Sequence, residues 1–77
     1  MKTVKIIFKH LSENPETTKF DLMKESENAF VKREMIEDTI RWLIKENVLT
    51  EVQSNGKIKA NIAREKIERF AKADIVI

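Results

Sequence analysis

The sequence contains no cysteine and no tyrosine, and it has only one glycine, one proline, one histidine and one tryptophan. Without cysteine there is neither a disulfide framework nor a thiolate metal site, so the fold must rest on the packing of its side chains. A single glycine and a single proline leave little material for a linker between domains. We therefore predict one domain over residues 1–77, with a small core.

Long hydrophobic runs are also missing. The N-terminal stretch MKTVKIIFKHL is interrupted by Lys5 and Lys9, and no small-residue cleavage site follows it, so it does not resemble a secretory signal. Hydrophobic residues make up 42% and charged residues 36% of the chain, a balance typical of a folded, soluble domain. We expect an intracellular, cytoplasmic protein that does not enter a membrane.

The residue types that most enzymes need are scarce. His10 is the sole histidine, there is no thiol, and no serine lies near a plausible base in the sequence. Glu34, Glu37 and Asp38 could together attract a hard cation, but the surface of a helix supplies too few oxygen ligands, and a solvated acidic face is the better interpretation. We predict that the protein is not an enzyme and has neither a catalytic residue, a cofactor nor a metal site.

The formal charge of +2 is unevenly distributed along the chain. Residues 1–12 carry three lysines and no acid, whereas residues 13–56 carry six basic and ten acidic residues. Residues 57–77 again favour positive charge, with six basic and three acidic residues. Since a polyanion binds a local patch rather than a net charge, the basic ends matter more than the total.

Two segments have the apolar periodicity of an amphipathic helix. The first covers residues 3–12, and its apolar face consists of Val4, Ile7, Phe8 and Leu11. Pro15 cannot continue this helix, so the segment Ser12–Pro15 should end it. The second runs from about Val31 to about Asn47, a residue that tolerates the left-handed conformation often found where helices stop. Its apolar stripe consists of Ile36, Ile40, Leu43 and Ile44, with Trp42 on a flank.

A shorter helix is expected between these two. Thr18 followed three residues later by Asp21 resembles a capping box, which predicts a helix over residues 19–25. It would bury Phe20, Leu22 or Met23. The polar segment that follows, residues 26–28, is then expected to be a turn.

A hairpin should follow the longest helix. Val48 to Val52 favours a strand, and Asn55-Gly56 is a strong signal for a tight turn because both residues accept positive φ. The returning strand would be Lys57 to Ile62. A two-residue loop would pair Leu49 with Ile62 and Val52 with Lys59, which does not separate apolar from polar faces, so a longer loop remains open. A last helix carries Ala63, Ile67, Phe70 and Ala71 at helical spacing.

The resulting fold class is α+β, mainly α, in the order helix, helix, helix, strand, strand, helix. This order and the apolar pattern Ile36-x3-Ile40-x2-Leu43-x4-Val48-Leu49-x2-Val52 resemble the winged helix-turn-helix family over about residues 4–62. Asn47 stands where that family usually has glycine. The resemblance implies a two-stranded hairpin wing, a third helix that enters the major groove of DNA, and a wing that touches the backbone or the minor groove. An appended helix in this family is often a dimerisation element.

The resemblance predicts a small DNA-binding protein, a transcriptional or replication regulator that binds double-stranded DNA. The side chains expected to contact DNA are Lys32, Arg33, Arg41, Lys57 and Lys59. The two arginines would contact bases or phosphates, and Lys32 and Lys57 would bind phosphates. Lys59 would contact DNA from the wing. Against this prediction, Glu34, Glu37 and Asp38 would face or border the negatively charged duplex.

Two further expectations concern partners. The alternative to DNA binding is a winged-helix module for protein interaction, which would use the acidic face of the third helix together with Trp42. We also predict a homodimer through residues 63–77, because the last helix and the apolar end Ile75-Val76-Ile77 need burial that so small a core cannot supply.

Overall fold

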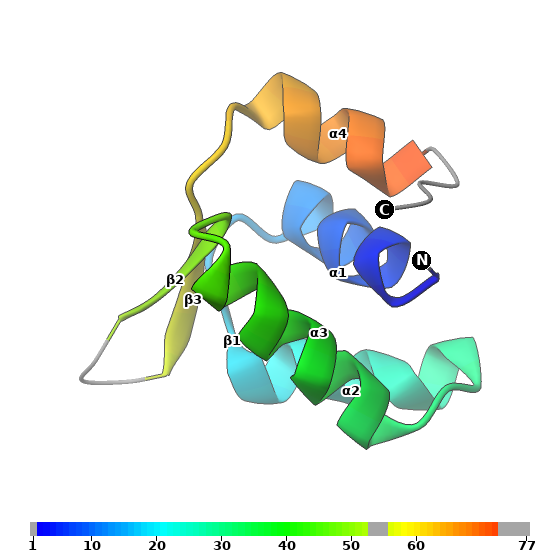
Figure 1. Cartoon of the computed structure of the whole chain (residues 1–77). Coiled ribbons are helices and arrows are strands. Elements are labelled where there is room, and N and C mark those ends of the chain that lie inside the picture. The colour runs from blue at the N-terminus through cyan, green and yellow to red at the C-terminus, as the bar shows by residue number, and fades with distance from the viewer. Residues whose placement is uncertain (1, 53–55, 73–77) are drawn as a thin grey trace.

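The computed structural model describes residues 2–52 and 56–72, and within them the protein has an α+β fold that is mainly helical. Four helices and a three-stranded antiparallel sheet lie within these residues (Figure 1). The elements in chain order are α1 (Lys2–Glu13), β1 (Thr17–Thr18), α2 (Lys19–Ala29), α3 (Arg33–Lys45), β2 (Leu49–Val52), β3 (Lys57–Ala60) and α4 (Arg64–Lys72). Helix α1 packs between α4 on one side and the α2–α3 pair on the other, and the sheet lies at one end of the helices.

The sheet has one strand more than the sequence predicts. Strand β1 pairs with β3, with Thr17 opposite Ile58 and Thr18 opposite Lys57, so β3 lies in the centre of the sheet. The predicted two-stranded sheet was therefore incomplete, because a strand of two residues has no periodicity that a sequence pattern can detect. The extra strand joins the start of α2 to the hairpin: the Lys19 backbone N–H donates a hydrogen bond to the Gly56 carbonyl at 3.0 Å.

The hairpin register settles the alternative that the sequence left open. Leu49 lies opposite Ala60 and Val52 opposite Lys57, so the connection is longer than two residues and the pairing of Leu49 with Ile62 is wrong. In this register Leu49 and Ile58 are buried, while the side chains of Lys57 and Lys59 project into solvent. Gly56 has φ of 64°, and Asn55 lies outside the described residues.

In the described residues, the core is formed by ten buried apolar side chains from α1, α2, α3 and the hairpin. The predicted apolar faces of α1 and α3 supply most of it, and each such side chain stabilises the fold by roughly 1.5–3 kcal/mol through burial. Trp42 and Ile44 are half-buried and pack against its edge. The core residues are Val4, Ile7, Phe8, Leu11, Leu22, Ile36, Ile40, Leu43, Leu49 and Ile58.

The ends of α2 confirm one prediction and correct another. The Thr18 side chain caps the N-terminus, accepting a hydrogen bond from the Asp21 N–H at 3.1 Å, as the capping-box pattern predicts. The expected turn at residues 26–28 is wrong, because these residues form the last turn of the helix. Phe30 stops the helix in a left-handed conformation with φ of 55°, which costs a non-glycine residue about 1–2 kcal/mol and so is rarely anticipated from sequence.

The end of α3 follows the prediction. Asn47 has φ of 65°, and the Val48 N–H donates to the Leu43 carbonyl at 2.9 Å, the closing bond of a left-handed helix stop. The chain then turns directly into β2. The Asn61 side chain fastens this junction by donating to the Asn47 carbonyl at 3.1 Å and to the Thr50 hydroxyl at 2.6 Å.

Helix α4 lies along α1. Its Ile67, Phe70 and Ala71 are half-buried, and the Phe70 ring meets the Phe8 ring at a centroid distance of 5.2 Å with the planes tilted by 58°. These apolar side chains therefore pack within the chain, which removes part of the reason to expect a dimer through α4. The segment Ile75–Ile77 lies outside the described residues. In the described part of the chain, no helix has the length and apolar character that crossing a membrane requires.

Candidate nucleic-acid interface

The five predicted contact residues are all exposed and lie on two elements. Lys32 is the N-cap residue of α3, Arg33 is the first residue of the helix, and Arg41 lies two turns further along. Lys57 and Lys59 alternate with buried Ile58 on β3, so both project from the same face of the sheet.

The exposed side of α3 and the end of the hairpin border a common hollow. It has a volume of about 460 Å³, and Lys19 and Phe20 of α2, Glu37 of α3 and Gly56 of the hairpin line it together with Thr18 and Met23. The hydrogen bond from Lys19 to Gly56 fixes the hairpin end beside the start of α2. A ligand that contacts α3 here also lies close to the hairpin.

Arg41 is held by carboxylates of its own helix. Its Nη2 lies 3.2 Å from Glu37 Oε1 and its Nη1 lies 3.9 Å from Asp38 Oδ1. The second oxygen of Glu37 lies 3.8 Å from Lys19 Nζ. Exposed pairs of this kind contribute only about 0–1 kcal/mol to stability, but they compensate the charge of Arg41, one of the five side chains predicted to contact DNA. Helix α3 as a whole has three basic and three acidic side chains.

Arg33 has a different neighbour. Its Cζ lies 5.8 Å from the centre of the Phe20 ring, and Lys24 Nζ lies 4.8 Å from the same centre. The prediction that α2 buries Phe20, Leu22 or Met23 is confirmed by Leu22, which is fully buried, whereas Phe20 is 57% exposed. Sequence analysis missed Lys19, Phe20 and Lys24 as site residues. The spacing of Phe20 and Lys24, one helical turn apart, was the signal available for two of them.

The remaining three lysines form no ion pair within the described residues, although Glu16 lines a hollow together with Lys57 and Lys59. Among residues 2–52 and 56–72, no carboxylate lies within 4.0 Å of the ammonium groups of Lys32, Lys57 or Lys59. Their charges are therefore uncompensated at short range. Among the five predicted contact residues, their ammonium groups are the least compensated by ion pairs.

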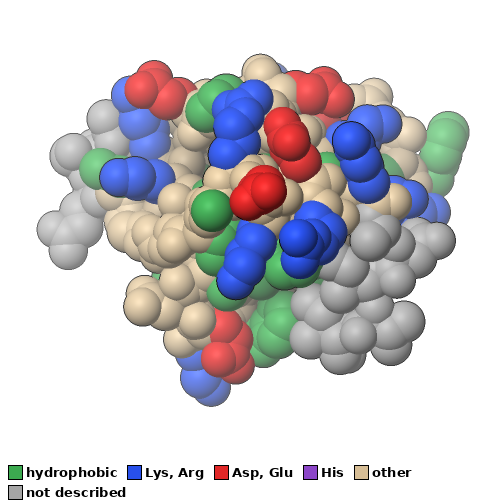
Figure 2. Space-filling view, turned by 90° about the horizontal axis from the view of Figure 1, so that it is seen from above, with side chains coloured by type: hydrophobic (Ala, Val, Ile, Leu, Met, Phe, Trp, Pro, Cys, Tyr) green, Lys and Arg blue, Asp and Glu red, His purple; other side chains and the backbone are tan. Residues whose placement is uncertain are grey.

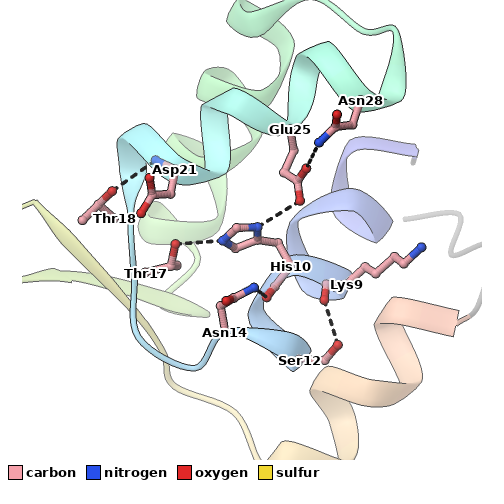
Figure 3. Close-up of polar contacts among 9 residues, drawn as sticks. All are labelled: Lys9, His10, Ser12, Asn14, Thr17, Thr18, Asp21, Glu25 and Asn28. Carbon is pink, nitrogen blue, oxygen red and sulfur yellow. Dashed lines mark hydrogen bonds and ion pairs between the residues drawn. The ribbon is translucent and has the colours of Figure 1, made fainter.

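A second polar cluster lies at the junction of α1, β1 and α2 (Figure 3). His10 Nδ1 lies 2.9 Å from Glu25 Oε2, and His10 Nε2 lies 2.9 Å from the Thr17 hydroxyl. Asn28 Nδ2 donates to the other Glu25 oxygen at 2.8 Å. The hydrogen bond with His10, and after it that from Asn28, lowers the pKa of Glu25 below its usual value.

The order of groups in that cluster, hydroxyl, imidazole and carboxylate, is that of a nucleophilic triad. Sequence analysis found no such arrangement because Thr17 and Glu25 lie 7 and 15 residues from His10 and meet it only in the folded chain. Thr17 is only 5% exposed, so its hydroxyl offers a substrate little access. The geometry is that of a clamp that joins two helices and a strand.

The face formed by α4 carries charges of both signs. Figure 2 shows lysine and arginine side chains interspersed with carboxylates over this helix, rather than a surface of one sign. Arg64 and Glu68 form an ion pair one helical turn apart on α4, with Nε and Oε1 3.5 Å apart. This face is a weaker candidate for binding a polyanion than the surface of α3 and the hairpin.

Comparisons with models of protein families, with curated proteins and with solved structures find no match for this chain.

Proposed function

We propose that this protein is a small DNA-binding regulator of winged-helix type that contacts duplex DNA with α3 and with the β2–β3 hairpin. The order α1, α2, α3, β2, β3 and the fixed position of the hairpin beside α2 and α3 support the winged-helix layout. The observation that carries the proposal is a set of exposed cations at the start of α3 and on β3 that have no carboxylate within 4.0 Å among the described residues. They are Lys32, Arg33, Lys57 and Lys59.

Phosphate contacts supply most of the affinity in this proposal. Duplex DNA carries one negative charge per about 1.7 Å of helix axis, and each lysine or arginine that meets a phosphate releases condensed counterions. Helix α3 has no net charge, because Arg33, Arg41 and Lys45 are matched by Glu34, Glu37 and Asp38. The hairpin lysines and the N-terminal end of α3 must therefore provide the attraction.

Titration of the protein with mixed-sequence duplex DNA, repeated between about 50 and about 200 mM salt, tests the proposal. We expect log affinity to fall linearly with log salt, with a slope of roughly −3 to −5 that corresponds to about four or five phosphates. The triple variant K32A/K57A/K59A should lose roughly three units of that slope. An absence of binding at the lowest salt would contradict DNA binding.

A second candidate function, a protein-interaction module, is favoured by two exposed apolar side chains. Phe30 is 94% exposed and Met35 is 50% exposed, both near the N-terminal end of α3. Trp42, the contact suggested by the sequence, is half-buried against the core and is less suitable as an anchor. If duplex DNA fails to bind at low salt, the region around Phe30 and Met35 is the surface to test for a protein partner.

The homodimer through α4 and residues 73–77 stays a prediction. Light scattering at two protein concentrations a hundredfold apart tests it, since a dimer of moderate affinity dissociates on dilution. A monomer mass at both concentrations would contradict the dimer, and the half-buried α4 residues would then be explained by α1 alone.

A further inference from the structure

Phe20 is an aromatic side chain that is more than half exposed at the start of α2. Two cations converge on its ring from different helices: Lys24 from the next turn of α2, and Arg33 from the first turn of α3. The contact between Phe20 and Lys24 follows from helical spacing. The contact with Arg33 depends on how α2 and α3 pack, so the ring joins charges that the chain does not bring together locally.

An aromatic ring and a carboxylate hold a cation with different consequences. A carboxylate cancels the positive charge, as Glu37 and Asp38 do for Arg41. The face of a ring attracts a cation through its quadrupole but carries no net charge, so the cation keeps its full charge for another anion. In the described part of the chain, Lys24 and Arg33 have no carboxylate within 4.0 Å, although Asp21 and Glu34 are exposed on the same two helices.

We infer that Phe20 is a positioning residue that holds Lys24 and Arg33 as a two-cation clamp for two adjacent backbone phosphates of duplex DNA. This inference rests on the proposed function and names a contact within it. Long cationic side chains lose rotamer freedom when they bind, and a ring that already restrains them lowers that entropic cost. Phe20 lines the hollow between α2, α3 and the hairpin, whereas Lys24 and Arg33 are exposed at the ring beside it, where the DNA backbone can approach.

The variants F20L and F20W separate this role from packing. Phe20→Leu removes the ring but keeps an apolar side chain, and since the position is exposed the melting temperature should fall by no more than a few degrees. We expect its affinity for duplex DNA to fall about three- to tenfold. The salt slope should change little, since both cations remain. Phe20→Trp should keep the wild-type affinity because tryptophan binds cations at least as well.

A double-mutant cycle measures whether the ring acts through Lys24. The affinities of wild type, F20L, K24A and the double variant F20L/K24A are compared at one salt concentration. We expect K24A to reduce the salt slope by about 0.9, and the double variant to bind almost as well as K24A alone. The matched control is K45A, an exposed lysine in the last turn of α3, whose effect should add to that of F20L.

The outcomes distinguish the clamp from the function on which it rests. If wild type does not bind duplex DNA, the proposed function and the clamp both fail. If wild type binds and F20L binds equally well, or if F20L and K24A act additively, the clamp is overturned and the proposed function stands. Loss of affinity in F20L with rescue in F20W and non-additivity with K24A supports the clamp.

Discussion

The two halves of α3 carry one arginine each, and the two arginines have opposite surroundings. Arg33 at the N-terminal end lies against the Phe20 ring, whereas Arg41 in the second half is paired with Glu37 and Asp38. Both are exposed. In the sequence they are equal candidates for DNA contact, but only the first keeps an uncompensated charge.

Helix geometry explains the difference. Arg41 has carboxylates three and four residues before it, the spacing at which side chains of one helix meet. Arg33 is the first residue of its helix, so no helical residue precedes it, and Glu37 four residues later is already occupied by Arg41 and Lys19. Its nearest partner therefore comes from α2. The number of cations on a helix is thus a poor guide to the number that can bind a phosphate.

The largest effect is expected from removing the uncompensated arginine. Arg33→Ala should lower the affinity for duplex DNA about tenfold or more, since a hydrogen bond to a charged group contributes about 1.5–3 kcal/mol. Its salt slope should fall by about 0.9. Arg41→Ala should bind more weakly than wild type by a smaller factor and keep the wild-type slope. Equal salt slopes for Arg33→Ala and Arg41→Ala would show that the pairing of Arg41 with Glu37 and Asp38 does not reduce its contact with phosphate.

Neutralising Glu37, which pairs with both Arg41 and Lys19, should make Arg41 more like Arg33 in its availability to phosphate. Glu37→Gln removes the charge that holds both Arg41 and Lys19, and it removes a repulsion from phosphate. We expect the affinity for DNA to rise several-fold, by about 1 kcal/mol. Glu34→Gln is the matched control, because it removes an exposed charge from the same helix without freeing a cation. A gain from Glu34→Gln as large as that from Glu37→Gln would mean that only the total charge matters.

The polar cluster of His10, Glu25 and Thr17 should affect the stability of the fold and not the binding of DNA. Because the pKa of Glu25 is lowered from its ordinary value of 4.5, the ionised carboxylate stabilises the folded state above about pH 4.5, and this contribution is lost as the pH falls through the lowered pKa. Glu25→Gln should flatten the acid limb of a plot of unfolding free energy against pH. Glu27→Gln on the same helix is the control and should leave the acid limb unchanged. An identical acid limb in wild type and Glu25→Gln would contradict a stabilising role of the polar cluster.

The smallest effect concerns the turn before α3. Phe30→Gly should raise the unfolding free energy by about 0.5–1 kcal/mol, because relief of the left-handed strain exceeds the entropic cost of glycine. The ring is almost fully exposed, so little packing is lost. Phe30→Ala keeps the strain and should bring no gain. Chemical denaturation of the three proteins measures this, and a less stable Phe30→Gly would show that the ring makes a stabilising contact.

Much of the fold could be predicted because its signals are local. The apolar faces of α1 and α3, the Thr18 cap and the helix stop at Asn47 each follow from residues a few positions apart, and the structure contains all of them. The predicted stop of α2 failed because the chain uses Phe30, a residue type that the left-handed conformation disfavours. Strand β1 was not predicted because its partner strand lies about forty residues away along the chain.

The candidate site was predictable in composition but not in pairing. Exposure of Arg33 and Arg41 followed from the helical periodicity of α3, whereas the exposure of Lys57 and Lys59 depended on a hairpin register that the sequence left open. Which of these charges is compensated depends on side-chain contacts, partly between helices, and the sequence pattern does not specify those contacts. Phe20 shows the same limit, since its spacing suits a buried face and only the packing of α2 on α3 leaves it exposed beside Arg33.

Mapping of the binding surface tests the central claim most directly. Nitrogen-15-labelled protein is titrated with a short mixed-sequence duplex, and the backbone amide shifts are followed residue by residue. The account predicts that the largest changes cluster on residues 19–24, 32–37 and 56–59, with smaller changes near Arg41. Shift changes concentrated on α1 and α4 would contradict it, as would the absence of any change at low salt.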